Sequence, residues 1–309
     1  MAKEKVPCDD KSYDAIIVGG GPAGITAAIY LARRKLCVLV LYEKLGGQAA
    51  LTADIENYAG FKFITGTDFT QKLEEHLEEY DITNKETKVT EIKQTKEGFL
   101  VKTKEKHFLG KTVIIGSGAR QRKLRVPGEE EYLNKGVAYC ATCDAPLFRG
   151  KNVAIIGGGN SALEAAIQLE KYAEKIYIIT INKDLEGEKV LIDKVKSFKN
   201  SEIICCSKTK EIKGKVFVES VIIEDDKNKT KEIKVGGVFV EIGYIPNSEI
   251  FKGKKNDYKE IIIDSKNKTS IQGIFAAGDV TAVQVKQIIV AAGEGAKAAV
   301  SCAEYLNRL

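Results

Sequence analysis

Histidine is scarce in this sequence: only His76 and His107 occur among 309 residues. His76 stands among glutamates on an expected helix face, and His107 follows a lysine-rich stretch. We interpret both as surface residues. Histidine is the side chain most often used as a general acid or base near neutral pH. Chemistry that depends on a buried histidine base therefore has few candidates here.

Long uninterrupted apolar segments are also missing. The first ten residues contain no apolar stretch of the kind that a secretory signal needs. The longest nearly uncharged run, 15–32, has the length of a membrane span, but the letters GGGP at 19–22 interrupt it. We interpret this run as a strand, a turn and a helix. The sequence therefore predicts a cytoplasmic protein without a membrane segment.

The charge balance excludes further classes of protein. Lysine and arginine total 48 and aspartate and glutamate total 43, a net charge of +5. This charge is too small for a nucleic-acid-binding surface, but it favours an acidic protein partner over a basic one. Hydrophobic residues make up 44% and charged residues 29%, which is typical of a globular protein. The length suggests about two domains.

Seven cysteines are present. Because the cytoplasm is reducing, we do not expect a framework of structural disulfides, and most of these cysteines are interpreted as small buried apolar residues. The sequence assigns no role to five of them: Cys8, Cys37, Cys205, Cys206 and Cys302.

The other two cysteines form the motif Cys140-Ala-Thr-Cys143, which Asp144 follows. A zinc site would need a second pair of ligands, and the adjacent Cys205 and Cys206 are poorly spaced for tetrahedral chelation. Two intervening residues permit a small disulfide ring, in which one thiol attacks a substrate while the other faces an electron carrier. An acid beside the pair can give a proton to a departing thiolate. The motif therefore predicts a redox disulfide, and no metal is expected.

A glycine loop near the N-terminus indicates a dinucleotide site. An apolar strand at 13–18 leads into Gly19-x-Gly21-x-x-Gly24, and a helix follows to about residue 35. The first glycine permits a tight turn, the second lets a pyrophosphate approach the backbone, and the third lets helix and strand pack closely. Amides at the start of the helix face the phosphates. Glu43, after the next strand, is placed to bind a ribose hydroxyl.

The same pattern starts again in the middle of the chain. A strand at 153–156 leads into Gly157-x-Gly159-x-x-Ala162 and a second helix. At the end of the following strand, an acid binds the ribose of NAD and an arginine binds the 2′-phosphate of NADP.

The segment in that position reads TINKDLEG at 180–187, with neither signature. Asp184 lies late for the NAD role, Lys183 is the nearest cation, and Glu186 would repel a phosphate. Two interpretations stay open: an unusual nicotinamide site, or a fold that has lost its ligand.

The order of these segments predicts an α/β protein with two Rossmann-like dinucleotide-binding domains, the second inserted into the first. Each glycine loop is followed by a β-rich segment, at 88–109 and 201–240. An apolar strand near the C-terminus ends at Gly278-Asp279, where the aspartate either binds a cofactor hydroxyl or simply ends the strand. A last helix covers about 285–306.

Together these motifs resemble the low-molecular-weight thioredoxin reductases, over nearly the whole chain from about Tyr13. The distance from CATCD to GGGNS is the most specific feature. The segments that carry the resemblance are GGGPAG at 19–24, GGQ at 46–48, IENYAGF at 55–61, GVAYCATCD at 136–144, GGGNSALEAA at 157–166, FAAGDV at 275–280 and KQIIVAAGEG at 286–295.

The resemblance implies an FAD domain of residues 1–117 and 247–309, an inserted domain at 118–246, and a homodimer. It implies that electrons pass from FAD to the Cys140–Cys143 disulfide and on to thioredoxin. Cys143 would face the flavin and Cys140 would attack the substrate, with Asp144 as the acid. The first glycine loop and the resemblance together assign flavin binding to Gly19, Gly21, Pro22, Ala23, Gly24, Glu43, Gly46, Gly47, Gln48, Asn57, Gly278, Asp279, Lys286, Gln287 and Ile288.

One departure from the family concerns the electron donor. NADPH-dependent members carry His-Arg-Arg and a further arginine after the second glycine loop, where this chain has Thr180-Ile-Asn182 and Glu186. In lacking this clamp the chain resembles the ferredoxin-dependent flavin thioredoxin reductases. The net charge of +5 suits an acidic ferredoxin. A basic cluster suits it too, although solvated surface explains that cluster equally well; its members are Arg120, Arg122, Lys123 and Arg125.

Three hypotheses follow for the activity. The first is a thioredoxin reductase that takes electrons from reduced ferredoxin. The second is the same enzyme with NADPH or NADH as donor, bound through unusual contacts such as Lys183 or Asn182. The third is an FAD-binding redox sensor, or a partner of a peroxiredoxin, without thioredoxin reductase turnover.

Overall fold

The structure is a computed structural model that describes residues 12–309 with the exception of residue 53. Cys8 lies outside the described residues. The chain divides into two compact units, one made of Met1–Arg120 and Ile245–Leu309, the other of Gln121–Tyr244. The boundaries lie within three residues of those expected from the sequence.

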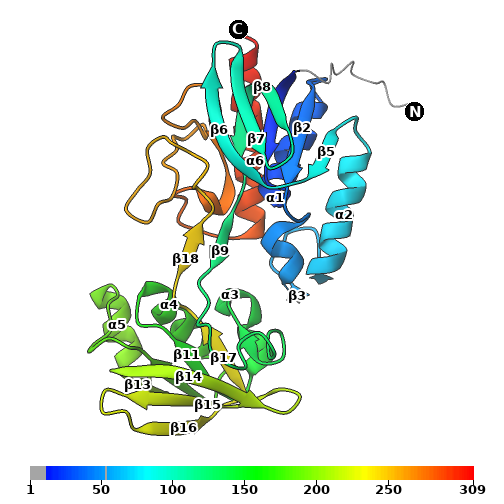
Figure 1. Ribbon diagram of the computed structural model, residues 1–309. Coiled ribbons are helices and arrows are strands. Elements are labelled where there is room, and N and C mark those ends of the chain that lie inside the picture. Colours follow the sequence, from blue (N-terminus) through cyan, green and yellow to red (C-terminus); the bar gives the residue numbers. More distant parts are fainter. Residues whose placement is uncertain (1–11, 53) are drawn as a thin grey trace. The chain divides into compact units, whose positions relative to one another are not determined.

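The first unit is built on a seven-stranded sheet in the order β5-β2-β1-β8-β7-β6, with β19 paired to β8. Strands β1, β2, β5, β8 and β19 pair in parallel, whereas β6 and β7 form the antiparallel extension. The sheet strands are β1 (Tyr13–Val18), β2 (Val38–Tyr42), β5 (Thr83–Glu86), β6 (Val89–Thr95), β7 (Gly98–Thr103), β8 (His107–Ile115) and β19 (Ile274–Ala276). The remaining elements are α1 (Pro22–Ala32), η1 (Gly47–Leu51), β3 (Asp54–Ile55), β4 (Ile64–Thr65), α2 (Gly66–Glu78), η3 (Gly278–Val280) and α6 (Ile288–Leu306) (Figure 1).

Alternation along the central strands explains how both faces of this sheet are covered. Ala15 and Ile17 pack into one apolar cluster with residues of α1 and α6, whereas Ile16 and Val18 pack into another with β6, β7 and the segment 250–274. Parallel strands that are buried on both faces read as continuous apolar runs. The run at 13–18 is therefore a central strand of the sheet.

The inserted unit repeats this plan. Its five-stranded sheet has the order β10-β17-β11-β12-β13 and is parallel throughout. A three-stranded antiparallel sheet, β14-β15-β16, packs its apolar residues against one face, and helices α4 and α5 pack against the other. The bounds are β10 (Val137–Ala138), α3 (Ala141–Asp144), η2 (Ala145–Phe148), β11 (Asn152–Ile156), α4 (Asn160–Leu169), β12 (Lys175–Ile179), α5 (Lys189–Lys196), β13 (Ser201–Ile204), β14 (Ser207–Gly214), β15 (Val218–Asp225), β16 (Thr230–Lys234) and β17 (Gly237–Val240).

Two short strands, β9 (Ala119–Gln121) and β18 (Tyr244–Pro246), pair where the chain passes between the units. The predicted α/β class with Rossmann-like domains is confirmed. None of the helices in the described part of the chain has both the length and the apolar character to cross a membrane.

Two glycines of α6 provide a test of how α1 and α6 pack. A Cβ added to Gly295 would overlap the Ala23 carbonyl oxygen, whereas a Cβ on Gly293 would meet nothing within 4 Å. We expect Gly295→Ala to lower the free energy of unfolding by about 1–3 kcal/mol through overpacking. Gly293→Ala, the matched control, should raise it by up to ~1 kcal/mol because alanine favours a helix. Denaturant titrations followed by circular dichroism measure both, and equal stability of the two variants would contradict the packing argument.

Candidate active site

The first glycine loop joins β1 to α1 through very close backbone contacts. Gly19 has φ of 121°, a left-handed conformation that glycine tolerates, and a Cβ there would overlap the carbonyl oxygen of Gly116. A Cβ on Gly24 would overlap the carbonyl oxygen of Gly19. Gly21 differs, because the nearest atom to an added Cβ is the Gly46 carbonyl oxygen at 3.9 Å. The outer face of the loop at Gly21 is therefore open to a ligand.

Most of the flavin residues expected from the sequence lie close together in this unit. The Gly46 amide donates to the Gly20 carbonyl at 2.8 Å, which places the segment 46–48 beside the loop. Gly278, with φ of 75°, packs against Ala23 at the start of α1. Pro22 is the first residue of α1, where its missing N–H leaves no hydrogen bond unmade.

A hydrogen bond joins two predicted residues that lie far apart in the sequence. Asn57 Nδ2 donates to Gln287 Oε1 at 3.0 Å across a separation of 230 residues. Gln287 precedes Ile288, the first residue of α6, so this contact brings the C-terminal helix to the segment that contains Asn57. The two distant motifs therefore contribute to one region.

Asp279 is the most strongly perturbed acid of this region. Burial raises the pKa of its carboxyl group, and the nearby Lys286 ammonium partly opposes that shift. Lys286 also binds Glu260 at 2.9 Å and donates to the carbonyl oxygens of Asp279 and Thr281. Within the described part of the chain, no group donates a hydrogen bond to the Asp279 carboxyl. A half-buried carboxyl that receives no hydrogen bond from these residues fits a site that receives a hydroxyl from a ligand.

Glu43 follows β2, as expected for an acid that binds ribose. Its side chain is exposed and forms an ion pair with Lys88, with Nζ 3.1 Å from Oε1. Gln48 is also exposed. An exposed pair of this kind contributes little to stability, so Glu43 can exchange Lys88 for a hydroxyl. These three features fit the parts of a flavin dinucleotide. The open face of Gly21 fits the pyrophosphate, the Asp279 carboxyl fits the hydroxyls, and Glu43 fits the ribose.

The predicted redox pair lies in the inserted unit, at a short helical turn after β10. Cys140 and Cys143 form a disulfide, with their Cα atoms 5.3 Å apart. Cys140 precedes α3, and its Sγ accepts a hydrogen bond from the Cys143 amide at 3.2 Å. Both cysteines and Asp144 are half-buried. The turn therefore presents a disulfide, an amide donor and a carboxyl group within five residues.

A buried acid fixes the chain just before this turn. Glu129 is 1% exposed and accepts hydrogen bonds from the Leu124 and Arg125 amides at 2.8 and 2.7 Å. The Tyr139 hydroxyl donates to the same carboxylate at 2.7 Å. Burial and this carboxylate raise the pKa of Tyr139. Tyr139 is therefore held in place immediately before Cys140.

The second glycine loop keeps the architecture of a nucleotide site. A Cβ on Gly157 would overlap the Glu241 carbonyl oxygen, and Gly159 has nothing within 4 Å. Gly157 corresponds to Gly19, where the backbone leaves no room for a side chain. Gly159 corresponds to Gly21, whose outer face is open. The loop alone does not distinguish a working site from a scaffold.

The strand end beside this loop lacks the groups that select a nicotinamide dinucleotide. Thr180 is buried with its side chain close to Gly158, and Ile181 is 71% exposed. Asp184, which lies slightly beyond the position expected for a ribose-binding acid, pairs with Lys196, with Oδ1 3.7 Å from Nζ. Glu186 and Glu188 lie against the loop itself: the Glu186 amide donates to Gly158 and the Glu188 amide to Asn160 Oδ1. The segment whose backbone contacts the loop therefore carries two glutamates and, over residues 180–188, no arginine.

The basic cluster is partly neutralised by neighbouring acids. Arg120 binds Glu249 at 2.9 Å and also contacts Asn247, and Lys123 binds Glu130 at 2.5 Å. The other two members, Arg122 and Arg125, are exposed. The cluster therefore offers less free positive charge to an acidic partner than its sequence suggests.

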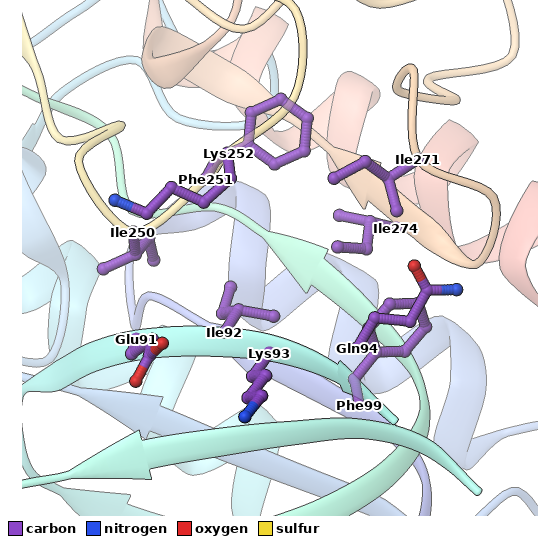
Figure 2. Close-up of a pocket in the computed structure, with 10 residues that line it drawn as sticks. All are labelled: Glu91, Ile92, Lys93, Gln94, Phe99, Ile250, Phe251, Lys252, Ile271 and Ile274. Carbon is purple, nitrogen blue, oxygen red and sulfur yellow. The ribbon is translucent and has the colours of Figure 1, made fainter. Parts of the chain in front are cut away.

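Figure 2 shows a pocket of ≈ 270 Å³ in the first unit, between β6, β7 and the segments 250–252 and 271–274. Ile92, Phe99, Phe251 and Ile274, which line it, belong to the buried core of that unit. It contains none of the residues that the sequence assigns to flavin or to catalysis. We interpret it as a gap at the margin of the core.

Comparison with known proteins settles the family. The family model for pyridine nucleotide-disulphide oxidoreductases matches residues 13–295. The chain belongs to this family. It is close to the low-molecular-weight thioredoxin reductases: the crystal structure of thioredoxin reductase from Streptococcus pyogenes superposes with a TM-score of 0.92 and 38% identity, over 97% of this chain and 100% of that one. FAD is therefore its cofactor, and the chain is a thioredoxin reductase-like flavin disulfide oxidoreductase.

Longer curated proteins are similar over the same region. A Staphylococcus aureus protein, named as one of the subunits of alkyl hydroperoxide reductase, is 42% identical over 301 residues, which are 96% of this chain and 59% of that protein. A Bacillus subtilis protein named NADH dehydrogenase is 41% identical over 304 residues, 97% of this chain and 60% of that protein. The oxidoreductase thus spans about three fifths of the length of these curated relatives.

Sequence reasoning missed one acid near the cysteine pair. Glu241 follows β17, which pairs in parallel with β10, the strand that leads to Cys140, and burial raises the pKa of its carboxyl group to about 8. Its sequence surroundings, VFVEIGY, show only a polar residue at the end of an apolar strand. The pairing of distant strands that brings it to the turn was not visible in the sequence.

The open face at Gly21 gives a test of the flavin site. We expect Gly21→Ala to lower FAD affinity at least tenfold, about 1.4 kcal/mol, because the methyl group would occupy the space of the pyrophosphate. The apoprotein should keep its stability, since no protein atom lies closer than 3.9 Å to the added Cβ. Flavin fluorescence on titration with FAD measures the affinity. Gly159→Ala is the matched control in the second loop, and an unchanged FAD affinity for Gly21→Ala would contradict this assignment.

Proposed function

We propose that this oxidoreductase reduces the disulfide of thioredoxin, with electrons passing from FAD in the first unit to Cys140–Cys143 in the second. The observation that carries the proposal is the disulfide at the start of α3 in a chain so similar to a thioredoxin reductase. The proposal assigns FAD to residues 1–117 and 247–309 and the redox turn to the insert at 118–246. We further propose a cytoplasmic homodimer, as the resemblance implies.

The cysteines perform an exchange in which atoms and electrons balance. FAD, when bound, supplies the two electrons that the pair needs. The Cys140–Cys143 bond breaks on taking up two electrons and two protons and gives two thiols. Cys140 gives its proton to the Asp144 carboxylate, and its thiolate bonds to one sulfur of the thioredoxin disulfide; the other thioredoxin sulfur leaves as a thiolate and takes that proton from Asp144. The Cys143 sulfur then attacks Cys140, which restores the internal disulfide, and the second thioredoxin sulfur leaves as a thiolate and takes up the proton that Cys143 has lost.

For the electron donor we propose reduced ferredoxin, with two ferredoxins giving one electron each. The support is the strand end at Thr180-Ile-Asn182, which has no arginine, together with Glu186 and Glu188 against the second loop. Carboxylates there disfavour a 2′-phosphate. The basic cluster adds only modest support, because Arg120 and Lys123 are already paired with glutamates.

A second candidate donor is NADH. It has no 2′-phosphate to bind, and the intact second loop together with the similarity to the Bacillus subtilis protein named NADH dehydrogenase favours it over NADPH. The similarity to a component of alkyl hydroperoxide reductase supports a further alternative, in which this protein is the redox partner of a peroxiredoxin and does not reduce thioredoxin. A measurement of thioredoxin reduction distinguishes this alternative from our first proposal.

Anaerobic mixing of the oxidised holoenzyme with each donor decides between these cases. We expect excess NADPH and excess NADH to leave the flavin absorbance unchanged on the time scale of turnover. Reduced ferredoxin should bleach it and, when thioredoxin is added, produce two thiols per two electrons. Rapid bleaching by NADH or NADPH would refute the ferredoxin assignment and make the second glycine loop a working nucleotide site.

Replacement of one cysteine tests the redox pair itself. We expect Cys143→Ser to abolish thioredoxin reduction with any donor, by more than about 10³-fold, because a single thiol cannot restore the internal disulfide. The flavin should still bind and accept electrons. Cys206→Ser, at a half-buried free cysteine of the same unit, is the control and should leave turnover unchanged. Substantial activity of Cys143→Ser would refute the exchange mechanism.

A further inference from the structure

A lysine-rich loop at residues 252–259, here called the lysine loop, lies on the surface of the first unit. It contains four lysines, with Asp257 as the acid among them. The side chains of Lys252, Lys254 and Lys259 are exposed, and none of the three forms an ion pair with the described residues of the chain. The loop is therefore a surface of concentrated positive charge.

Other basic segments of the chain are neutralised to a greater extent. In the three-stranded sheet of the inserted unit, Lys210 pairs with Glu224 at 3.2 Å. Lys123 of the basic cluster is paired with a glutamate as well. Arg120 of that cluster binds Glu249, an acid that lies just before the lysine loop in the sequence. Because Glu249 is already engaged, it does not cancel the charge of the loop.

Hydrogen bonds hold the lysine loop in one conformation. The Asn256 amide donates to the Glu260 carbonyl oxygen at 3.0 Å, and the Glu260 amide donates back to Asn256 Oδ1 at 2.9 Å. Ser248 joins the two ends of the loop. Its hydroxyl donates to the Lys259 carbonyl oxygen, and its own carbonyl oxygen accepts from Lys255 Nζ, each at 2.6 Å. A surface that is already ordered loses little conformational entropy when a partner binds.

The loop adjoins the segment to which we assign flavin binding. Glu260, the residue after the loop, forms an ion pair with Lys286 at 2.9 Å. Ile261 is fully buried, and its amide donates to the Val280 carbonyl oxygen at 2.9 Å. Val280 is the last residue of η3, which also contains Asp279. A protein bound to the lysine loop is therefore brought to the edge of the proposed flavin site.

An aromatic side chain stands among these charges. Tyr258 is 80% exposed and lies in the turn that the Asn256–Glu260 hydrogen bonds close. Tyrosine is enriched at protein interfaces, because its ring offers apolar contact area and its hydroxyl offers a hydrogen bond. Charges that surround an exposed aromatic ring fit a protein partner better than a small anion.

We propose that the lysine loop, with Tyr258 in its turn, is the surface on which an acidic one-electron carrier protein docks to reduce the flavin. This inference rests on the proposed function, because it takes reduced ferredoxin as that carrier. The lysine charges steer an acidic partner and raise the rate of encounter. Each docking event oxidises one carrier by one electron. Two events supply the two electrons that the Cys140–Cys143 disulfide takes up, and the two protons come from solvent.

The first experiment measures how fast reduced ferredoxin bleaches the flavin of the wild-type holoenzyme and of Lys254→Gln/Lys259→Gln, in anaerobic stopped flow. We expect the second-order rate constant of the variant to be about fivefold or more lower at about 20 mM salt. At about 0.5 M salt the two rate constants should converge, because salt screens the charges. Thermal unfolding followed by circular dichroism should show that the variant is folded.

A matched control removes two positive charges elsewhere in the same unit. Arg34→Gln/Lys72→Gln changes two exposed residues, of which Arg34 follows α1 and Lys72 lies on α2. In Figure 1, α2 and the yellow-orange segment that contains the lysine loop lie on opposite sides of the first unit. The control should keep the wild-type rate constant within about twofold, because steering depends on where the charges lie. Tyr258→Ala changes no charge, so its rate constant should be lower at every salt concentration.

Cross-linking locates the surface in the unaltered enzyme. A carbodiimide joins lysines directly to carboxylates, and mass spectrometry should find carboxylates of the acidic ferredoxin joined to residues 252–259. Equal rate constants for Lys254→Gln/Lys259→Gln and the wild type at low salt, or cross-links that lie only elsewhere, would overturn the proposal. A wild-type flavin that stays oxidised would instead refute ferredoxin as the donor. The cross-links would then still decide whether an acidic protein docks on the lysine loop.

Discussion

Close approach of one backbone segment to another at glycine is the constraint on which both units depend. Gly19 and Gly24 bring the end of β1, the start of α1 and Gly116 to distances that no side chain would allow, and Gly157 does the same beside Glu241. These contacts fix where each helix begins relative to its sheet. The open faces at Gly21 and Gly159, and the polar groups after the strands, have defined positions only because of that packing.

The two glycine loops show that this packing and ligand selection are separate properties. The first loop is accompanied by Asp279, with its buried carboxyl, and by the Asn57–Gln287 contact, so that polar groups from distant segments converge on it. The second loop has the same backbone geometry but is followed by a buried threonine, an exposed isoleucine and two glutamates. A glycine fingerprint is thus reliable evidence of a fold, whereas the ligand depends on the strand ends.

Local sequence patterns were sufficient to predict the fold class, the central strands and the redox disulfide. The continuous apolar run at 13–18 predicted a strand, which the structure shows to be buried on both faces, and the two-residue spacing of Cys140 and Cys143 predicted their disulfide. The turn α3 and the helix α5 (Lys189–Lys196) were not predicted, because the first has a single turn and the second has only one fully buried residue, Val195. The pairing of Lys123 with Glu130 and the pairing of β17 with β10, the strand that leads to Cys140, depend on folding that no local pattern reveals.

Glu241 lies at the edge of the inserted sheet to which the second glycine loop belongs. In an open parallel sheet, ligands bind in the crevice at the carboxyl ends of the strands. Glu241 stands at that edge, and its amide donates to the carbonyl oxygen of Ile156, the residue before the second glycine loop. Burial raises the pKa of its carboxyl group to about 8. The strand end that follows the second glycine loop has no arginine at Thr180-Ile-Asn182. The edge that binds nucleotides in related folds therefore offers no cation to a 2′-phosphate at that strand end, which is the physical basis for proposing a protein as the electron donor.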